Sequence, residues 1–68
     1  MKVKIRHFEE AKSVFLCNID YKELDLLINF IKMSSGFYFN GNQEPFHSYQ
    51  LAMDEGEAYI EILIGEEE

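Results

Sequence analysis

The sequence predicts an α+β fold in two layers, in which an antiparallel β-sheet of four or five strands carries one helix packed on it. Three patterns lead to this fold class. Residues 2–6 alternate charged and β-branched side chains, as in a half-buried strand. Residues 20–34 repeat apolar side chains at helical spacing, and residues 46–64 alternate around a Glu55-Gly56 turn, as in a β-hairpin. The expected order of elements is β-β-α-β-β-β.

The length of 68 residues allows a single domain, residues 1–68, with a thin hydrophobic core. Hydrophobic residues make up 47% of the chain, which argues against disorder. No segment reaches the roughly 20 apolar residues of a membrane span, and the N-terminus lacks the apolar block of a signal peptide. We therefore expect a cytoplasmic protein, either of the cell that encodes it or of a host cell. Residues 66–68 form an acidic tail that we expect to fray.

The first two strands are expected at residues 2–8 and 13–19. A four-residue loop between them would place Ile5 opposite Leu16. The second strand is apolar on both faces, and a strand of this kind is usually central in a sheet or half covered by another chain. Cys17, the single cysteine, is expected to be a small buried residue of this strand.

A helix is expected from Asp20 to about Ser34. Asp20 suits the N-cap position, and Glu23 lies three residues later, where it can complete a capping box. Gly36 suits the left-handed conformation that ends many helices. The apolar side chains of this helix form two ridges. The ridge expected to cover the sheet consists of Leu24, Leu27, Ile28 and Ile31, and the second ridge consists of Leu26, Phe30 and Met33.

The second ridge, formed by Leu26, Phe30 and Met33, has no obvious partner within the chain, because a helix on one sheet needs an apolar stripe of only about 100°. Exposed together, these side chains would make an apolar patch that is large for a monomer. We therefore expect an apolar interface here, and homodimerisation about a twofold axis is the commonest arrangement. The alternative is that the sheet curls around the helix, or that residues 37–46 fold over the ridge.

After the helix, residues 37–39 read Phe-Tyr-Phe and are expected to form a short strand, followed by a loop over residues 40–45. The C-terminal hairpin then pairs residues 46–53 with residues 57–64. Its expected register places Gln50 opposite Glu61 and His47 opposite Ile64. It sends the acidic side chains of the last strand to the outer face, away from the apolar residues. The expected partner-binding acidic face consists of Asp54, Glu55, Glu57, Tyr59 and Glu61.

Charge is distributed unevenly along the chain, whose net charge is −7. Residues 1–34 contain all six basic residues, whereas residues 35–68 contain none and carry eight acidic ones. This distribution argues against direct binding of nucleic acid and of anionic membranes, because phosphate contacts need clustered Lys and Arg. The expected partner is a basic protein surface. The alternative is that the acidic residues only keep a small protein soluble.

The sequence contains no motif of a phosphate-binding loop, a dinucleotide site, a zinc protease or a serine hydrolase. His7, His47 and Cys17 could each donate to a metal, but their spacing fits no metal-site pattern. We therefore expect no enzymatic activity, no metal site and no cofactor. Each histidine is expected in a strand, near the edge of the core.

Small size, acidity and the lack of catalytic motifs give a profile that resembles small inhibitors encoded by phages and mobile elements, among them anti-CRISPR and DNA-mimic proteins. The resemblance implies a viral or mobile-element inhibitor that docks its negative C-terminal half on a basic, nucleic-acid-binding surface of a partner protein. The alternative is a homo-oligomeric structural or accessory protein, whose acidity serves solubility only. Salt separates the two, because docking by charge weakens as salt increases, whereas apolar self-association does not.

Overall fold

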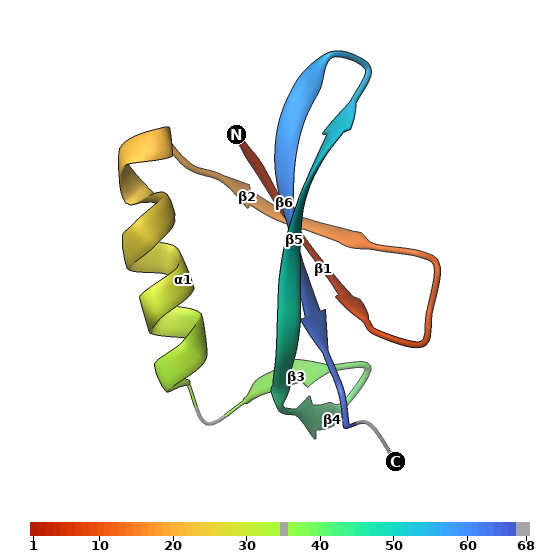
Figure 1. Ribbon diagram of the computed structural model, residues 1–68. Coiled ribbons are helices and arrows are strands. Elements are labelled where there is room, and N and C mark those ends of the chain that lie inside the picture. Colours follow the sequence, from red (N-terminus) through yellow and green to blue (C-terminus); the bar gives the residue numbers. More distant parts are fainter. Residues whose placement is uncertain (35, 67–68) are drawn as a thin grey trace.

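The computed structural model describes residues 1–34 and 36–66. Its elements, in chain order, are strands β1 (Lys2–His7) and β2 (Val14–Asn18), the 3-10 turn η1 (Tyr21–Glu23), helix α1 (Leu24–Met33), and strands β3 (Phe37–Phe39), β4 (Asn42–Glu44), β5 (Phe46–Asp54) and β6 (Glu57–Ile64) (Figure 1). The α+β class with one α-helix in the described residues is therefore confirmed. Strand β4 lies where a loop was expected, and it pairs with β3 across a turn at Asn40 and Gly41, both of which have positive φ.

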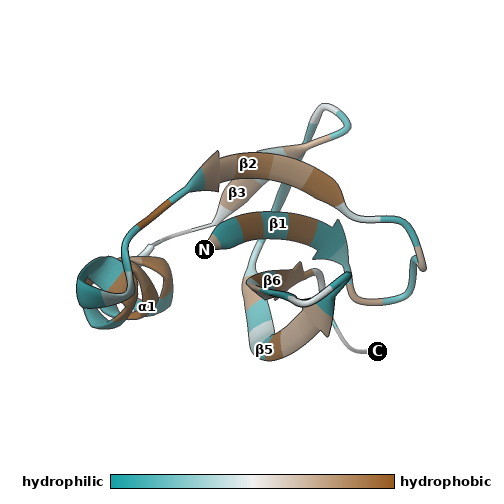
Figure 2. Ribbon diagram, turned by 90° about the horizontal axis from the view of Figure 1, so that it is seen from above, coloured by the Kyte–Doolittle hydropathy of each residue, from teal (hydrophilic) through white to brown (hydrophobic). Residues whose placement is uncertain are grey.

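Four strands form one sheet in the order β2-β1-β6-β5, and β3 and β4 form a separate sheet of two strands. The pairs β1–β2 and β5–β6 are antiparallel, as expected. Strands β1 and β6, however, run parallel, so that the four-stranded sheet is mixed. The strands fan about a pronounced twist, with β2 and β5 at the two edges (Figures 1 and 2).

The core lies between α1 and one face of the four-stranded sheet, which we call the helix face. Parallel pairing of β1 with β6 sets Val3 opposite Ile60 and Ile5 opposite Ile62 on this face. The buried apolar side chains of the described residues are Val3, Ile5, Ile31, Ile60, Ile62 and Ile64. Ile31 is the contribution of α1, which lies beside the helix face in Figure 2. We call the opposite side of the sheet, which carries no helix, the open face.

Helix α1 ends close to the expected position, but its N-terminal end differs from the expectation. Residues 21–23 form a 3-10 turn, and the Asp20 side chain makes no cap hydrogen bond; instead, the backbone N–H of Glu23 donates to the Asp20 carbonyl oxygen. The expected capping box is therefore wrong. At the other end Gly36 has φ +141°, and a Cβ atom there would lie 2.9 Å from the carbonyl oxygen of Glu44, so glycine is required at this position.

The C-terminal hairpin has the expected register over most of its length, and Gln50 lies opposite Glu61. A bulge in β5 then places Phe46, rather than His47, opposite Ile64. Beyond β6, Glu66 is exposed, whereas the other two residues of the expected acidic tail, at positions 67 and 68, lie outside the described residues.

The register of the first hairpin differs from the expectation. Ile5 pairs with Val14 rather than with Leu16. Val3 pairs with Cys17, one residue away from the expected register, and a bulge in β2 then shifts the pairing by one residue more. Strand β2 lies at the edge of the sheet, and all five of its residues are exposed. Cys17 is one of them, so the expectation that it is buried is wrong.

Candidate protein-binding surfaces

The open face of the sheet carries three ion pairs between β1 and the C-terminal hairpin. They join Lys2 to Glu57 at 3.7 Å, Lys4 to Asp54 at 3.6 Å and Arg6 to Glu61 at 2.7 Å. Alternate residues of a strand share a face, so the parallel pairing of β1 with β6 brings these basic and acidic side chains together. Part of the negative charge of residues 35–68 is therefore neutralised in space, although no basic residue lies near it in the sequence.

Glu61 is the buried member of these pairs, with 5% of its surface exposed. Arg6 Nε and Gln50 Nε2 each donate to its Oε1 atom at 2.7 Å. Burial would raise the pKa of Glu61, but the hydrogen bonds from Arg6, Ser13 and Gln50, together with the Arg6 charge, outweigh burial and lower the pKa. Glu61 lies on the expected face of β6, but the expectation that it is exposed there is wrong, because these partners enclose it.

The other residues of the expected acidic face remain on the C-terminal hairpin. Tyr59 is half-buried, and Lys4 Nζ lies 4.3 Å from the centroid of its ring. Asp54 and Glu57 are exposed and belong to the ion pairs with β1. Glu55, at the hairpin tip, is the one carboxylate of this group without an ion pair in the part of the chain that the structure describes.

Arg6 also holds the loop between β1 and β2 against the sheet. Its Nη1 atom donates to the carbonyl oxygens of Phe8 and Glu10, in addition to the ion pair that Nε makes with Glu61. The ring of Phe8 stacks on that of His47, with centroids 4.4 Å apart. The far end of β1 and the bulged start of β5 are thereby connected through this loop.

The two histidines therefore lie in structural contacts. His47 stacks on Phe8, and His7 Nε2 lies 3.8 Å from the carboxylate of Glu44. Within residues 1–34 and 36–66, no three His, Cys, Asp or Glu side chains are grouped so that they could hold a metal ion. In the same residues, no helix is long and apolar enough to cross a membrane.

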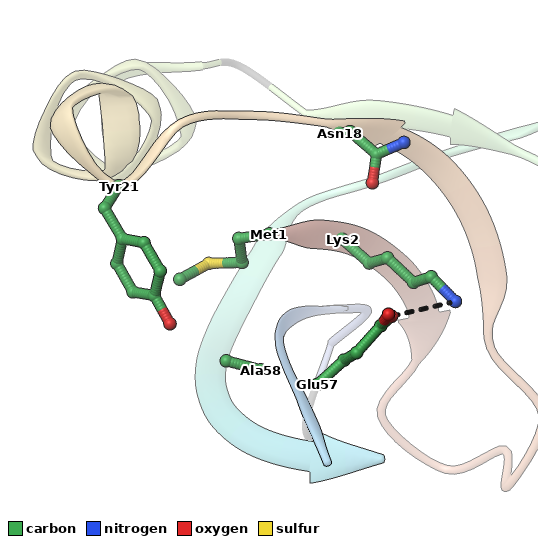
Figure 3. A pocket seen from close by; sticks show the side chains of 6 residues that line it. All are labelled: Met1, Lys2, Asn18, Tyr21, Glu57 and Ala58. Atoms are coloured by element: carbon green, nitrogen blue, oxygen red, sulfur yellow. Dashed lines mark ion pairs between the residues drawn. The ribbon is translucent and has the colours of Figure 1, made fainter. Parts of the chain in front are cut away.

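A polar hollow of about 340 Å³ lies near the N-terminus, where β1 and β6 begin and β2 ends (Figure 3). It is lined by Met1, Lys2, Asn18, Tyr21, Glu57 and Ala58. In Figure 3, Tyr21 and Met1 lie on one side and the ion pair of Lys2 with Glu57 on the other. Its two charged side chains, Lys2 and Glu57, pair with each other.

The second ridge of α1 is exposed as expected. Leu26, Phe30 and Met33 have 71%, 69% and 86% of their surface accessible, whereas the first ridge packs on the core. The alternatives in which the sheet or residues 37–46 cover the ridge are therefore excluded for this structure. The expected apolar interface is available on the surface of the single chain.

An apolar groove of about 610 Å³ lies beside this ridge, between α1 and the segment that leads into it from β2. It is lined by Ile19, Glu23, Leu26, Leu27 and Phe30, and we call it the α1 groove. Ile19 and Leu27 also pack against the core. Sequence reasoning named Leu26 and Phe30 but missed the groove, because the position of Ile19 depends on how β2 enters the helix.

A second exposed apolar surface is strand β2 itself. Val14, Phe15 and Leu16 are each about half exposed at the free edge of the sheet. Edge strands are usually protected by charged residues or proline, and β2 contains neither, although its bulge interrupts the edge. The signal was present in the sequence as a strand that is apolar on both faces. The expectation that this strand is central in the sheet is wrong, because β2 lies at the edge. The expectation that another chain covers it stays a prediction.

Comparison of the chain with protein-family models, with curated proteins and with solved structures gave no match. Its function must therefore be inferred from the chemistry of its own surface.

Proposed function

We propose that this chain is a small, non-catalytic protein-binding module that inhibits a basic partner protein by covering part of its surface. The observation that carries the proposal is the amount of apolar and aromatic surface left exposed. The large side chains concerned are Val14, Phe15, Leu16, Tyr21, Leu26, Phe30, Met33, Tyr38, Tyr49, Leu51 and Met53. Monomeric proteins rarely expose contiguous apolar patches of more than a few hundred Å², and larger patches mark interaction sites.

The size of the chain supports this reading. Its total accessible surface is 4896 Å². A standard protein–protein interface takes about 800 Å² from each partner, which is roughly a sixth of that surface. The exposed apolar side chains extend over β2, α1 and β5. A standard interface takes about 20–30 residues from each partner, so it would extend beyond any one of these elements.

Charge supports a basic partner. Among the described residues, the acids outside the four ion pairs are Glu9, Glu10, Asp20, Glu23, Asp25, Glu55 and Glu66, and the corresponding basic residues are Lys12, Lys22 and Lys32. The unpaired charge is therefore strongly negative. The electric field of this negative charge steers the chain toward a positive surface, and it makes the rate of association sensitive to salt.

The apolar surface and the acidic surface take different roles in this proposal. Mimicry of DNA would need several free carboxylates on the C-terminal hairpin, but Glu61 is buried there, and Asp54 and Glu57 are paired. We therefore assign most of the binding free energy to exposed apolar side chains, and assign to the free acids the choice and the steering of the partner.

The test is a pull-down with the tagged chain from a lysate of the source cell, at low and at high salt. We expect a basic partner that is retained at high salt, because apolar contacts are not screened. Three variants, Leu16→Gln, Phe30→Gln and Leu51→Gln, each alter one exposed element, and at least one should abolish capture. Capture that disappears at high salt would instead support docking by charge alone. If no protein is captured specifically at either salt concentration, the proposal is wrong.

A homo-oligomeric accessory protein is the second candidate, and the exposure of Leu26, Phe30 and Met33 favours it. Sedimentation equilibrium at high micromolar concentration separates the two candidates. A dimer that Phe30→Gln dissociates would support self-association through α1. A monomer would leave the ridge free for a different protein.

A further inference from the structure

We propose that the α1 groove binds an amphipathic helix of the basic partner, whose apolar side chains enter the groove while a Lys or Arg beside them pairs with Glu23. This inference rests on the proposed function, because it names the docking site and the kind of segment that occupies it. Three observations carry it: the shape of the groove, its chemistry and the charge at its edge.

The length of α1 and the volume of the groove suit a docked helix. α1 has ten residues and is therefore about 15 Å long. An amphipathic helix that docks through positions i, i+3 or i+4, and i+7 presents its anchors over about 11 Å, which α1 can accommodate along its length. The groove volume of about 610 Å³ provides room for several apolar side chains.

The lining of the groove is apolar and supported from beneath. Leu26 and Phe30 are largely exposed and form its outer wall, whereas Ile19 and Leu27 pack against the buried core. A groove with such support is present before binding, so little ordering free energy is lost when a partner docks. Phe30 supplies the large aromatic surface that often anchors an interface.

The charge beside the groove selects a basic segment. Glu23 lines the groove, is exposed and belongs to none of the ion pairs of the described residues. Asp20 and Asp25 lie on either side of it in the sequence, and Lys22 is the one basic residue between them. Residues 20–25 therefore carry a net charge of −2, from three acids and one base. A positive side chain beside the apolar anchors would complement this charge.

The same features disfavour a second copy of this chain as the occupant. A twofold contact between two copies would bring together two chains of net charge −7. A positively charged helix avoids this repulsion.

The experiment selects ligands for the full-length chain from a phage-displayed library of random peptides, each about 16 residues or four helical turns long. The immobilised Phe30→Gln variant serves for counter-selection. We expect the enriched peptides to repeat apolar residues at i, i+3 or i+4, and i+7 and to carry net positive charge. Circular dichroism of the best peptide, alone and bound, checks that it binds as a helix.

Fluorescence anisotropy with that peptide then maps the site. Leu26→Gln and Phe30→Gln should each weaken binding about tenfold or more. Glu23→Lys should weaken binding and flatten its dependence on salt. Met53→Gln is the matched apolar control, because Met53 is 67% exposed on β5, and it should leave binding unchanged. Glu55→Lys changes the net charge by the same amount outside the lining of the α1 groove, so it should weaken binding less than Glu23→Lys does. Thermal unfolding confirms that each variant is folded.

Two kinds of result would overturn the inference. The first is that the variants in the α1 groove bind the selected peptides as well as the original chain does, or that the enriched peptides are acidic or bind as strands. The second is a dimer of the free chain that Phe30→Gln dissociates, because a second copy would then occupy the groove. The pull-down keeps the two proposals apart: a partner still captured by Phe30→Gln but lost with Leu16→Gln would preserve the binding function and refute this site.

Discussion

Arg6 and Glu61 lie 55 positions apart in the chain and meet on the open face with 2.7 Å between Nε and Oε1. Gln50, from the neighbouring strand, donates to the same carboxylate oxygen. One buried carboxylate thus connects β1, β6 and β5. Because Arg6 also donates to carbonyl oxygens of the β1–β2 loop, this contact fixes both the parallel pairing and the loop above it.

The first prediction concerns the stability that Arg6 provides. Arg6→Met should lower the free energy of unfolding by about 3 kcal/mol, because it leaves the buried Glu61 carboxylate without its charge partner. Urea unfolding, followed by circular dichroism, measures this change. Lys2→Met is the matched control: it breaks the exposed pair with Glu57, and it should change stability by less than about 1 kcal/mol. Equal effects of the two substitutions would contradict the structural role of Arg6.

The second prediction concerns pH. The pKa of Glu61 is lowered in the folded chain, so its ionised form favours folding. This stabilisation is present above the ordinary value of 4.5, and it is lost as the pH falls from there through the lower pKa of the folded state. Glu61→Gln should therefore show a smaller loss of stability between about pH 7 and pH 3 than the original chain. The other carboxylates titrate in both proteins, so identical pH profiles would show that Glu61 contributes nothing.

Much of the local structure could be predicted from the sequence because it depends on periodicity. The alternation in β5 and β6 predicted that Gln50 lies opposite Glu61, and helical spacing predicted the two ridges of α1. The parallel pairing of β1 with β6 could not be predicted in this way. It joins residues more than fifty positions apart, and no local pattern records which distant strand becomes the neighbour.

The same pairing explains why the candidate site was predicted only in part. The sequence separates Lys4 from Asp54 by fifty residues, so the acidic half looked unopposed, but the fold brings the two side chains to 3.6 Å. The exposure of Phe30 could be predicted, because it follows from the helix alone. The α1 groove could not, because Ile19 reaches it only through the path of the chain between β2 and α1.

The third prediction compares two apolar residues that face each other across the C-terminal hairpin. Ile60 is fully buried, whereas Leu51, opposite it, is largely exposed. Ile60→Ala should lower the free energy of unfolding by about 2–5 kcal/mol, because it leaves a cavity in the core, and this loss could unfold so small a domain. Leu51→Ala should lower it by less than about 1 kcal/mol. If both substitutions lowered the free energy of unfolding by similar amounts, Leu51 would be as well buried as Ile60, which would contradict the packing of α1 on the sheet.

The fourth prediction concerns the helix ends. Asp20→Ala should change the free energy of unfolding by less than about 0.5 kcal/mol, because the Asp20 side chain makes no cap hydrogen bond. Ser34 at the other end differs, because its hydroxyl accepts a hydrogen bond from the N–H of Gly36 and donates one to the Gly36 carbonyl oxygen. Ser34→Ala should therefore cost about 1 kcal/mol in thermal or urea unfolding. A larger effect for Asp20 than for Ser34 would indicate that the capping box forms in solution.

The last prediction separates backbone strain from steric exclusion at two glycines. Gly65 follows β6 with φ +121°, and a Cβ atom there would lie 2.8 Å from Cδ1 of Phe8 and still closer to the His7 ring. Gly41, in the β3–β4 turn, has φ +82°, and a Cβ atom there would have no neighbour within 4 Å. Gly41→Ala should therefore cost only the strain of a left-handed residue, about 1 kcal/mol. Gly65→Ala should cause this strain and also displace the packed rings of His7 and Phe8. It should therefore lower the free energy of unfolding by about 1–3 kcal/mol more than Gly41→Ala does. Thermal unfolding of both variants measures the difference, and equal costs would mean that the β1–β2 loop can move away from β6 without loss of stability.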